Sequence, residues 1–177
     1  MLIQAGADVN TIDKHGDTPL HVAVARDNME LIKMLLAAGA KLDIQNQDDF
    51  TPLHLALGWE KLEIAKILIK SGANVNLPST LGKTPLHLVA AYKKDVTVAK
   101  MLIEAGANLN AKDTFGNSPL HWAAFLGNAP FAQVLIEAGA DINAKDSDGH
   151  TPLYRASTFY QGSVIKLLKA TGKVELK

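Results

Sequence analysis

The chain has 177 residues, of which 47% are hydrophobic and 20% are charged. This length and composition predict a folded chain with a sizeable core and exclude an intrinsically disordered one. Lysine plus arginine equals aspartate plus glutamate at 18 each. The chain therefore lacks the basic excess that nucleic-acid binding needs, and we expect no nucleic-acid partner.

Two further features of the composition bear on location and chemistry. Cysteine is absent, which excludes disulfides, thiolate metal sites and cysteine nucleophiles and agrees with a reducing compartment. No apolar run approaches the roughly 18 residues of a membrane span, and the opening MLIQAGAD lacks the basic start of a signal peptide. We therefore expect a cytoplasmic or nucleus-accessible protein without a membrane span.

Charge is unevenly spread along the chain. Residues 1–50 carry four basic against eight acidic side chains, a net charge of −4, and residues 151–177 carry five against one, a net charge of +4. These charges could belong to a solvated surface, or they could orient a partner whose own charge is uneven.

A short motif, DTPLHVA at residues 17–23, returns four times along the chain. The copies are FTPLHLA, KTPLHLVA, NSPLHWAA and HTPLYRA, which begin at residues 50, 83, 117 and 150. The Thr or Ser before proline recurs every 33 or 34 residues, at positions 18, 51, 84, 118 and 151. A glycine follows at 39, 72, 106, 139 and 172, so two landmarks share one period. Repetition with this period indicates stacked structural units.

Each copy predicts the same succession of elements. Thr18 and its equivalents are good N-caps, and the proline after each fits the first helical position, where no backbone donor is needed. A short helix begins there. A second helix follows, and in the first unit Leu31, Ile32 and Leu35 have the spacing of an amphipathic helix about three turns long. Gly39 and its equivalents end the second helix in the left-handed conformation, and a polar extended stretch with a turn leads to the next unit.

A helix pair of about 33 residues cannot bury its apolar face alone, so the units must stack on one another. With its T-P-L-H-x-A motif and its period, the chain resembles the ankyrin-repeat family over essentially its whole length. The resemblance implies an all-α solenoid of stacked helix-turn-helix units with β-turn fingers, in a single domain. The predicted parts are a partial repeat at 1–17 and repeats at 18–50, 51–83, 84–117, 118–150 and 151–177.

Two units depart from the pattern. The glycine of the finger turn, Gly16 in the first finger, is replaced by Asp49 in the next. If this position needs a positive φ, Asp49 is strained, because aspartate tolerates that conformation less well than glycine. The 34-residue unit has its extra residue near YKKD, residues 92–95, where we expect a slightly longer loop between the two helices.

Both ends of the chain carry expectations of their own. MLIQAGADVN at 1–10 matches MLIEAGANLN at 101–110, so we expect the chain to begin partway through a repeat and to be a fragment of a longer array. The last unit has Tyr154 in place of histidine and ends in KLLKATGKVELK, whose lysine-rich face suits a solvent-facing cap. A continuation into further repeats is the alternative.

Four of the five motifs carry a histidine at the same helical position: His21, His54, His87 and His121. Stacked helices lie about 8–10 Å apart, whereas zinc needs ligands about 2 Å from the metal, so this ladder cannot converge on one ion. The family resemblance implies instead that each histidine bonds the neighbouring Thr hydroxyl and the turn backbone. His15 and His150 lie in separate turns and are expected to be ordinary surface residues.

Motifs that would indicate catalysis are missing from the sequence. It contains no phosphate-binding glycine loop, no G-x-S-x-G and no H-E-x-x-H pattern, and we expect the adjacent Asp48 and Asp49 to be solvated in a turn. We predict no enzyme activity, no catalytic residue, no metal ligand and no cofactor.

The family resemblance places the partner surface on the concave side, which finger turns and the ends of the first helices build. Large apolar side chains recur at these positions, and an exposed apolar patch of this kind is uncommon in a soluble monomer without a partner. The predicted partner-binding residues are Phe50, Trp59, Leu81, Tyr92, Phe115, Phe125, Leu126 and Phe159. An inward orientation, in which the side chain pads the gap between helix and turn, is the alternative, above all for Phe50 and Phe115.

The sequence thus predicts a monomeric, non-catalytic module that binds a protein or peptide partner of unknown identity through a preformed concave face. Two alternatives stay open: a targeting or regulatory segment of a larger enzyme, channel or secreted effector, and a binder of a small ligand or nucleic acid. Turn asparagines also resemble the residue that is hydroxylated in some animal ankyrin repeats: Asn10, Asn76, Asn110 and Asn143.

Overall fold

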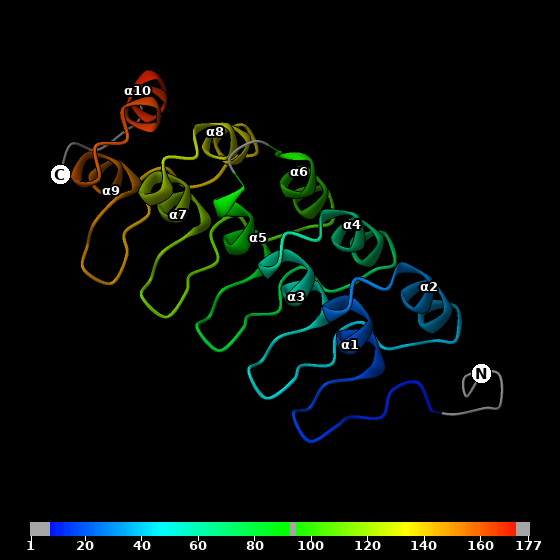
Figure 1. The fold of residues 1–177 in the computed structure, drawn as a ribbon. Coiled ribbons are helices and arrows are strands. Elements are labelled where there is room, and N and C mark those ends of the chain that lie inside the picture. Colours follow the sequence, from blue (N-terminus) through cyan, green and yellow to red (C-terminus); the bar gives the residue numbers. More distant parts are fainter. Residues whose placement is uncertain (1–7, 93–94, 173–177) are drawn as a thin grey trace. The chain divides into compact units, whose positions relative to one another are not determined.

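The computed structural model describes residues 8–92 and 95–172, and every regular element in these ranges is helical (Figure 1). Backbone contacts divide the chain into two compact parts, Met1–Thr80 (the N-terminal unit) and Leu81–Lys177 (the C-terminal unit). Among the described residues, no helix has the length and hydropathy that crossing a membrane requires.

The N-terminal unit consists of two helix pairs. In each pair a first helix begins at the proline of the repeated motif, and a second, longer helix follows it. The helices are α1 (Pro19–Ala25), α2 (Met29–Ala37), α3 (Pro52–Gly58) and α4 (Leu62–Lys70). α1 packs against both α2 and α3, and α3 packs against α4. Stacking therefore covers the apolar faces, as the repeat pattern predicts.

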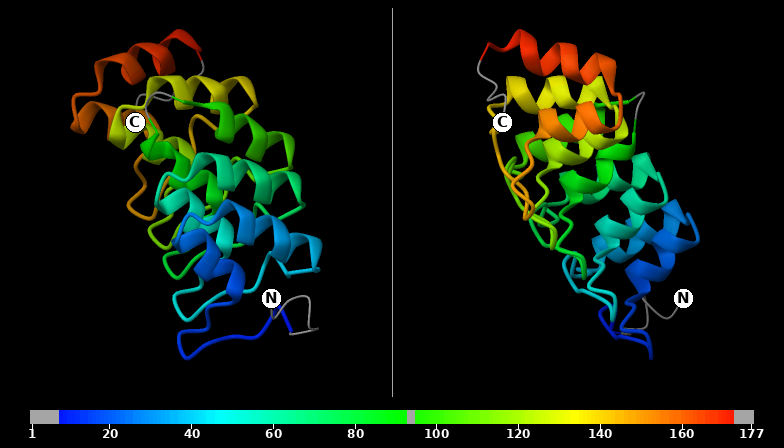
Figure 2. Two further views of the ribbon diagram at one scale, coloured as in Figure 1. Left: turned by 45° about the vertical axis from the view of Figure 1, so that its right-hand side comes forward. Right: turned by 90° about the vertical axis from the view of Figure 1, so that its left-hand side faces the viewer.

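The C-terminal unit consists of three further helix pairs, and Figure 2 shows their second helices stacked alongside one another. Its helices are α5 (Pro85–Leu88), the 3-10 helix η2 (Val89–Ala91), α6 (Thr97–Glu104), α7 (Pro119–Leu126), α8 (Ala129–Glu137), α9 (Pro152–Thr158) and α10 (Gly162–Ala170). α7 packs between η2 and α9, and α8 lies between α6 and α10. The predicted all-α, stacked helix-turn-helix architecture is confirmed.

The core of both units comes from the predicted apolar positions of the helices. The largest side chains that are fully buried are Leu20, Ile32, Leu35, Leu53, Leu57, Ile64, Leu68, Leu86, Leu102, Leu120, Phe131 and Leu135. They alternate between first and second helices along the chain. Burying a side chain of this size contributes about 1.5–3 kcal/mol, so each unit is held together mainly by the contacts between stacked helices.

The predicted helix boundaries are confirmed at both ends. Thr18 and its equivalents occupy the N-cap in extended conformation, with proline at the start of each first helix. The glycines after the second helices have positive φ, from +65° at Gly172 to +95° at Gly139. In the finger turns Asp49 has φ +56°, so it holds the left-handed conformation that glycine holds elsewhere, as the sequence predicts.

Neighbouring fingers are tied together by backbone hydrogen bonds. The N–H of Gln47 donates to the carbonyl oxygen of His15 over 3.0 Å, and the N–H of Ser147 donates to that of Phe115 over the same distance. Glycine at the turn permits this approach: a Cβ added to Gly116 would lie 2.6 Å from the backbone nitrogen of Ser147. Within each unit, therefore, each finger is fixed against the next.

The 34-residue unit departs from the others at its first helix. α5 has only four residues and continues as η2, whose C-cap is Tyr92. Of the four residues near which we expected a longer loop, 93 and 94 lie outside the described residues. The predictions about the two ends of the chain rest in part on residues 1–7 and 173–177, which also lie outside that range.

Candidate functional site

The four repeated histidines complete the caps of the first helices. In α1 the N–H of Thr18 donates to Nδ1 of His21 over 3.1 Å, while the Thr18 hydroxyl lies 2.8 Å from the same nitrogen. The other ring nitrogen lies 2.9 Å from the carbonyl oxygen of Phe50, in the next finger. The same cap recurs at His54, His87 and His121. The expected bonds to the Thr hydroxyl and the turn backbone are confirmed.

These contacts fix the tautomer of the ring. A backbone N–H can only donate, so Nδ1 of His21 must be the acceptor and Nε2 must carry the proton that it donates to Phe50. Burial also lowers the pKa of His21, His87 and His121, although the bonds to finger carbonyls raise it in part. A histidine held neutral with both nitrogens engaged is a structural link between neighbouring repeats of the same unit.

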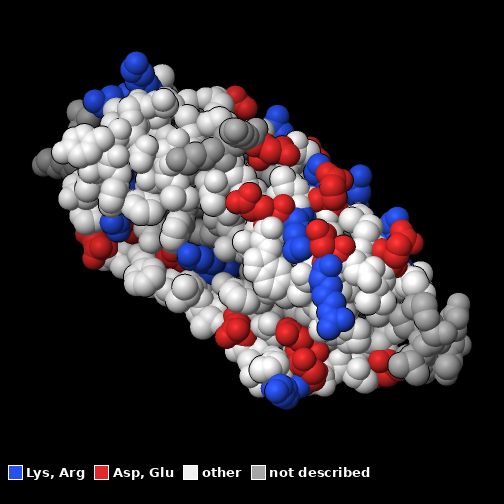
Figure 3. Space-filling model, in the orientation of Figure 1, with Lys and Arg blue, Asp and Glu red and all other residues white. Residues whose placement is uncertain are grey.

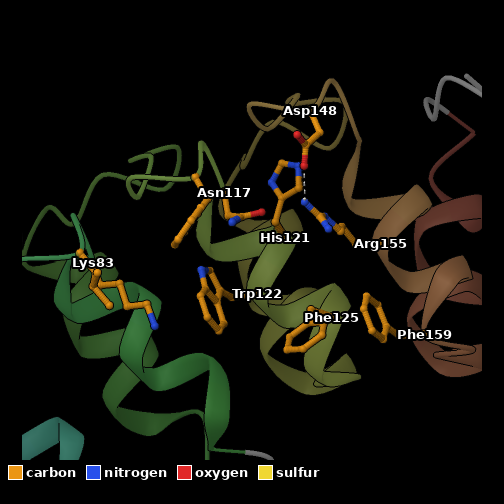
Figure 4. A pocket seen from close by; sticks show the side chains of 10 residues that line it. Lys83, Asn117, His121, Trp122, Phe125, Asp148, Arg155 and Phe159 are labelled. Carbon is orange, nitrogen blue, oxygen red and sulfur yellow. Dashed lines mark ion pairs between the residues drawn. The ribbon is translucent and has the colours of Figure 1, made fainter.

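A surface groove with a volume of about 310 Å³ lies in the C-terminal unit. The first helices α7 and α9 form its floor, and three finger segments form its rim (Figure 4). The lining residues are Leu81, Lys83, Phe115, Asn117, His121, Trp122, Phe125, Asp148, Arg155 and Phe159. The groove is thus built by the finger turns and first helices, the elements that the sequence associates with a partner.

Three aromatic rings in edge contact make the apolar floor. The rings of Phe125 and Phe159 meet edge to face with their centroids 4.5 Å apart, and Trp122 meets Phe125 edge to face at 6.0 Å. Phe125 and Phe159 keep 39% and 42% of their surface exposed. Figure 3 shows a broad area without charged side chains over α7 and α9. Exposed apolar area of this kind makes the groove a candidate site of interaction.

The indole of Trp122 is held by polar contacts on two sides. Its Nε1–H donates to Oδ2 of Asp113 over 2.8 Å, and Nζ of Lys83 lies 3.9 Å from the ring centroid. The Asp113 carboxylate is buried and also accepts from the backbone N–H groups of Phe115 and Asn117. The ring therefore has a fixed position, with a cation over one face.

An equivalent bond anchors Arg155 at the other end of the groove. Its Nε–H donates to Oδ2 of Asp146 over 2.8 Å. Its Nη2 lies 2.6 Å from the same oxygen and 3.6 Å from Oδ2 of Asp148. Burial raises the pKa of Asp146, but the backbone N–H of His150 and the guanidinium lower it more, and the net pKa lies below the ordinary value. Asp146 is therefore ionised at neutral pH and orients Arg155.

Asp146, Asp148 and His150 form the one group among the described residues whose spacing could suit a metal ion. The guanidinium of Arg155 already meets both carboxylates, which leaves the cluster with a cation in place. His150 is half-buried and stacks on Tyr154, with ring centroids 3.9 Å apart. It is therefore more than an ordinary surface residue, whereas His15 is exposed, as expected.

The structure brings four of the predicted partner-binding residues together in the groove: Leu81, Phe115, Phe125 and Phe159. Leu126 is half-buried beside it without lining it. Phe115 is 60% exposed, so it does not fold inward. In the N-terminal unit Trp59 is 52% exposed, while Phe50 is half-buried with its ring 6.1 Å from that of His54.

Tyr92 does not have the exposure that the prediction requires. Only 8% of its surface is exposed, so its side chain is buried. The reason lies in the short α5 and the 3-10 turn of η2, which place residue 92 differently from Trp59 or Phe159 at the ends of regular first helices. The expected row of exposed aromatic side chains is therefore interrupted at the repeat that contains Tyr92.

Sequence reasoning did not assign the polar half of the groove. It is lined by Lys83, Trp122, Asp148 and Arg155. For two of these, Trp122 and Arg155, an alignment of the repeats could have predicted the role. Trp122 and Arg155 occupy the same position of their first helices, nine residues after the aspartate that each bonds. A side chain that is polar or aromatic here, where other repeats carry Val22 or Leu55, indicates a contact outside the core.

Comparison with protein families gives one finding. The sequence model of the family described as "Ankyrin repeats (3 copies)" matches residues 1–79 and 86–177, nearly the whole chain. A comparison of the sequence with curated proteins finds no match.

Proposed function

Because the chain belongs to the ankyrin-repeat family, whose repeats are generally protein–protein interaction modules, we propose that it is a non-catalytic module that holds a protein or peptide partner. The partner would lie on the face made by the finger turns and the ends of the first helices, and its main contacts would be in the groove of the C-terminal unit. The groove's exposed apolar floor is the observation that carries this proposal.

The chemistry of the groove fits recognition rather than catalysis. Its histidine, His121, has one ring nitrogen in the cap of α7 and the other 3.0 Å from the carbonyl oxygen of His150. Asp148 faces the guanidinium of Arg155. No group of these three is placed as a nucleophile beside a base, which is the arrangement that nucleophilic catalysis needs.

The groove is also suited to binding because its side chains are already fixed. Trp122 and Arg155 are each bonded to a buried aspartate, and Phe125 and Phe159 support one another. Ordering a mobile side chain on binding costs about 0.5–1.5 kcal/mol. A partner that meets rings and ions already in position avoids most of that cost.

A comparison of captured proteins tests the proposal. The bait is the wild-type chain, beside a Phe125→Ala/Phe159→Ala variant, with lysate of the source cells as the pool. We expect a protein that the wild type retains and the variant loses, by at least tenfold, because interface hot spots contribute about 2 kcal/mol or more each. Equal capture by both would contradict the assignment of the partner to this groove.

A matched control removes two exposed side chains elsewhere on the same unit. Lys100 and Glu104 lie on the exposed side of α6, and a Lys100→Ala/Glu104→Ala variant should capture as the wild type does. Circular dichroism melting establishes that each variant folds. Phe115→Ala is the milder groove variant if the double substitution unfolds, since Phe115 is the most exposed of the lining aromatics.

A further inference from the structure

The charged side chains that line the groove have opposite sign at its two ends. Lys83 stands at the end occupied by Trp122, with its ammonium over the indole. Asp148 stands at the other end, beside Arg155, and its side chain is 70% exposed. Figure 4 shows the two residues well apart, with Trp122 and Arg155 in view and the Phe125 and Phe159 rings forming the floor.

The end that carries Asp148 is negative overall. Two carboxylates, those of Asp146 and Asp148, share one guanidinium. Arg155 lies closer to Asp146, at 2.6 Å against 3.6 Å, and Asp146 is buried. The remaining negative charge is therefore on Asp148, the carboxylate that a ligand can reach. The aromatic neighbour His150 is half-buried.

The opposite end presents a positive charge to a ligand. Asp113 also lies there, but its carboxylate is buried behind the indole and bonded by N–H groups of its own finger and of Trp122. Lys83 lines the groove, whereas Asp113 does not. At the Trp122 end, therefore, the charged group that lines the groove is the ammonium of Lys83.

From this arrangement, and resting on the proposed function of the groove, we propose that the partner is a peptide segment of alternating character. It carries an aromatic or large aliphatic anchor that packs on Phe125 and Phe159. On one side of the anchor lies a carboxylate that meets Lys83, and on the other lies an ammonium or guanidinium that meets Asp148. Complementary charges set the register and orientation of such a segment more than its affinity.

A segment that lies in the groove in either chain direction satisfies this pattern. The order of the two flanking charges therefore does not test the proposal, whereas their number and sign do. Reversing one charge in the groove makes its two ends alike. Lys83→Glu creates a groove with two negative ends, which should select two basic residues around the anchor. Asp148→Lys creates a groove with two positive ends, which should select two acidic residues.

The experiment selects a random peptide library, displayed on phage, against the folded wild-type chain, Lys83→Glu, Asp148→Lys and Phe159→Ala at about pH 8, where histidine is neutral. We expect the wild type to enrich peptides with an aromatic or large aliphatic residue flanked by one acidic and one basic residue. Lys83→Glu should shift the pool towards basic flanks and Asp148→Lys towards acidic flanks. Each mismatched charge should lower affinity roughly two- to fivefold, as for a partly exposed ion pair.

The outcomes separate the inference from the function on which it rests. Identical flanking charges in the wild-type, Lys83→Glu and Asp148→Lys pools, together with a loss of anchored peptides in Phe159→Ala, would overturn the charge inference and leave the groove as the binding site. A Phe159→Ala pool that equals the wild-type pool would show that peptides bind elsewhere, and would overturn both. No enrichment over an unrelated folded protein would also overturn both.

Discussion

Asn128 should be far more important for stability than Asn28, the asparagine at the same position of the first repeat. Its Oδ1 accepts from the N–H of Phe131 over 3.1 Å and so caps α8, and its Nδ2 donates to the carbonyl oxygens of Ala90 and Tyr92 over 2.8 and 2.9 Å. The residue is completely buried. Asn28 caps α2 in the same way, over 3.0 Å to Leu31, but is exposed.

These contacts set the expected magnitudes. Loss of an N-cap costs about 1 kcal/mol, and each buried carbonyl that loses its donor costs about 1 kcal/mol or more. We expect Asn128→Ala to lower the free energy of unfolding by about 3 kcal/mol and Asn28→Ala by about 1 kcal/mol. At an m-value of about 2 kcal/mol/M, the urea midpoints fall by roughly 1.5 M and 0.5 M.

A third variant isolates the two carbonyl bonds. Asn128→Asp keeps an oxygen that can cap α8 but replaces the donor with an oxygen that faces two carbonyls, so it should be at least as destabilising as Asn128→Ala. Urea unfolding followed by far-ultraviolet circular dichroism measures all three. Equal midpoints for Asn128→Ala and Asn28→Ala, or a tolerated Asn128→Asp, would refute the reasoning.

Two further predictions concern the finger turn and the buried histidines. Asp49→Gly should raise stability by a few tenths to about 1 kcal/mol, because Asp49 has φ +56°; thermal melting checks this against Asp48→Gly, which should not stabilise, and an unchanged curve for Asp49→Gly would count against the strain. The folded-state pKa of three buried histidines is lowered, so the unfolded chain binds more protons and stability should fall as the pH drops below about 6.5. The three histidines are His21, His87 and His121. Each of them that stays neutral in the folded chain contributes up to about 1.4 kcal/mol per pH unit to this loss of stability. Urea midpoints that do not change between neutral and mildly acidic pH would be inconsistent with the prediction.

Much of the fold could be predicted because each boundary depends on a local chemical requirement. The N-cap of a first helix needs the hydroxyl of Thr18 or an equivalent, and the end of a second helix needs a residue such as Gly39 that accepts a positive φ. The histidine of the motif bonds a backbone N–H of its own helix cap and a backbone carbonyl of the next finger, and both groups recur with the repeat. These requirements repeat with the period of the sequence, so one unit predicts the others.

What the sequence could not predict depends on one unit differing from its neighbours. The 3-10 turn of η2 follows no pattern in the repeat, and it moves Tyr92 from the expected surface into a buried position. From the sequence Asn128 is an ordinary cap, like Asn28, and only the folded η2 and its C-cap Tyr92 bring two carbonyls to its amide. The partners of Arg155 are likewise hidden, because the finger that carries Asp146 and Asp148 must first be folded back onto α9.

Photo-cross-linking tests the central claim, that the partner lies on the finger and first-helix face of the C-terminal unit. A benzoyl-phenylalanine replaces Phe115, which lines the groove, or Glu104, which lies on the exposed side of α6. Both proteins are irradiated in lysate of the source cells. We predict a cross-linked protein adduct from position 115 and none from position 104. An adduct from position 104 with none from position 115 would contradict the claim.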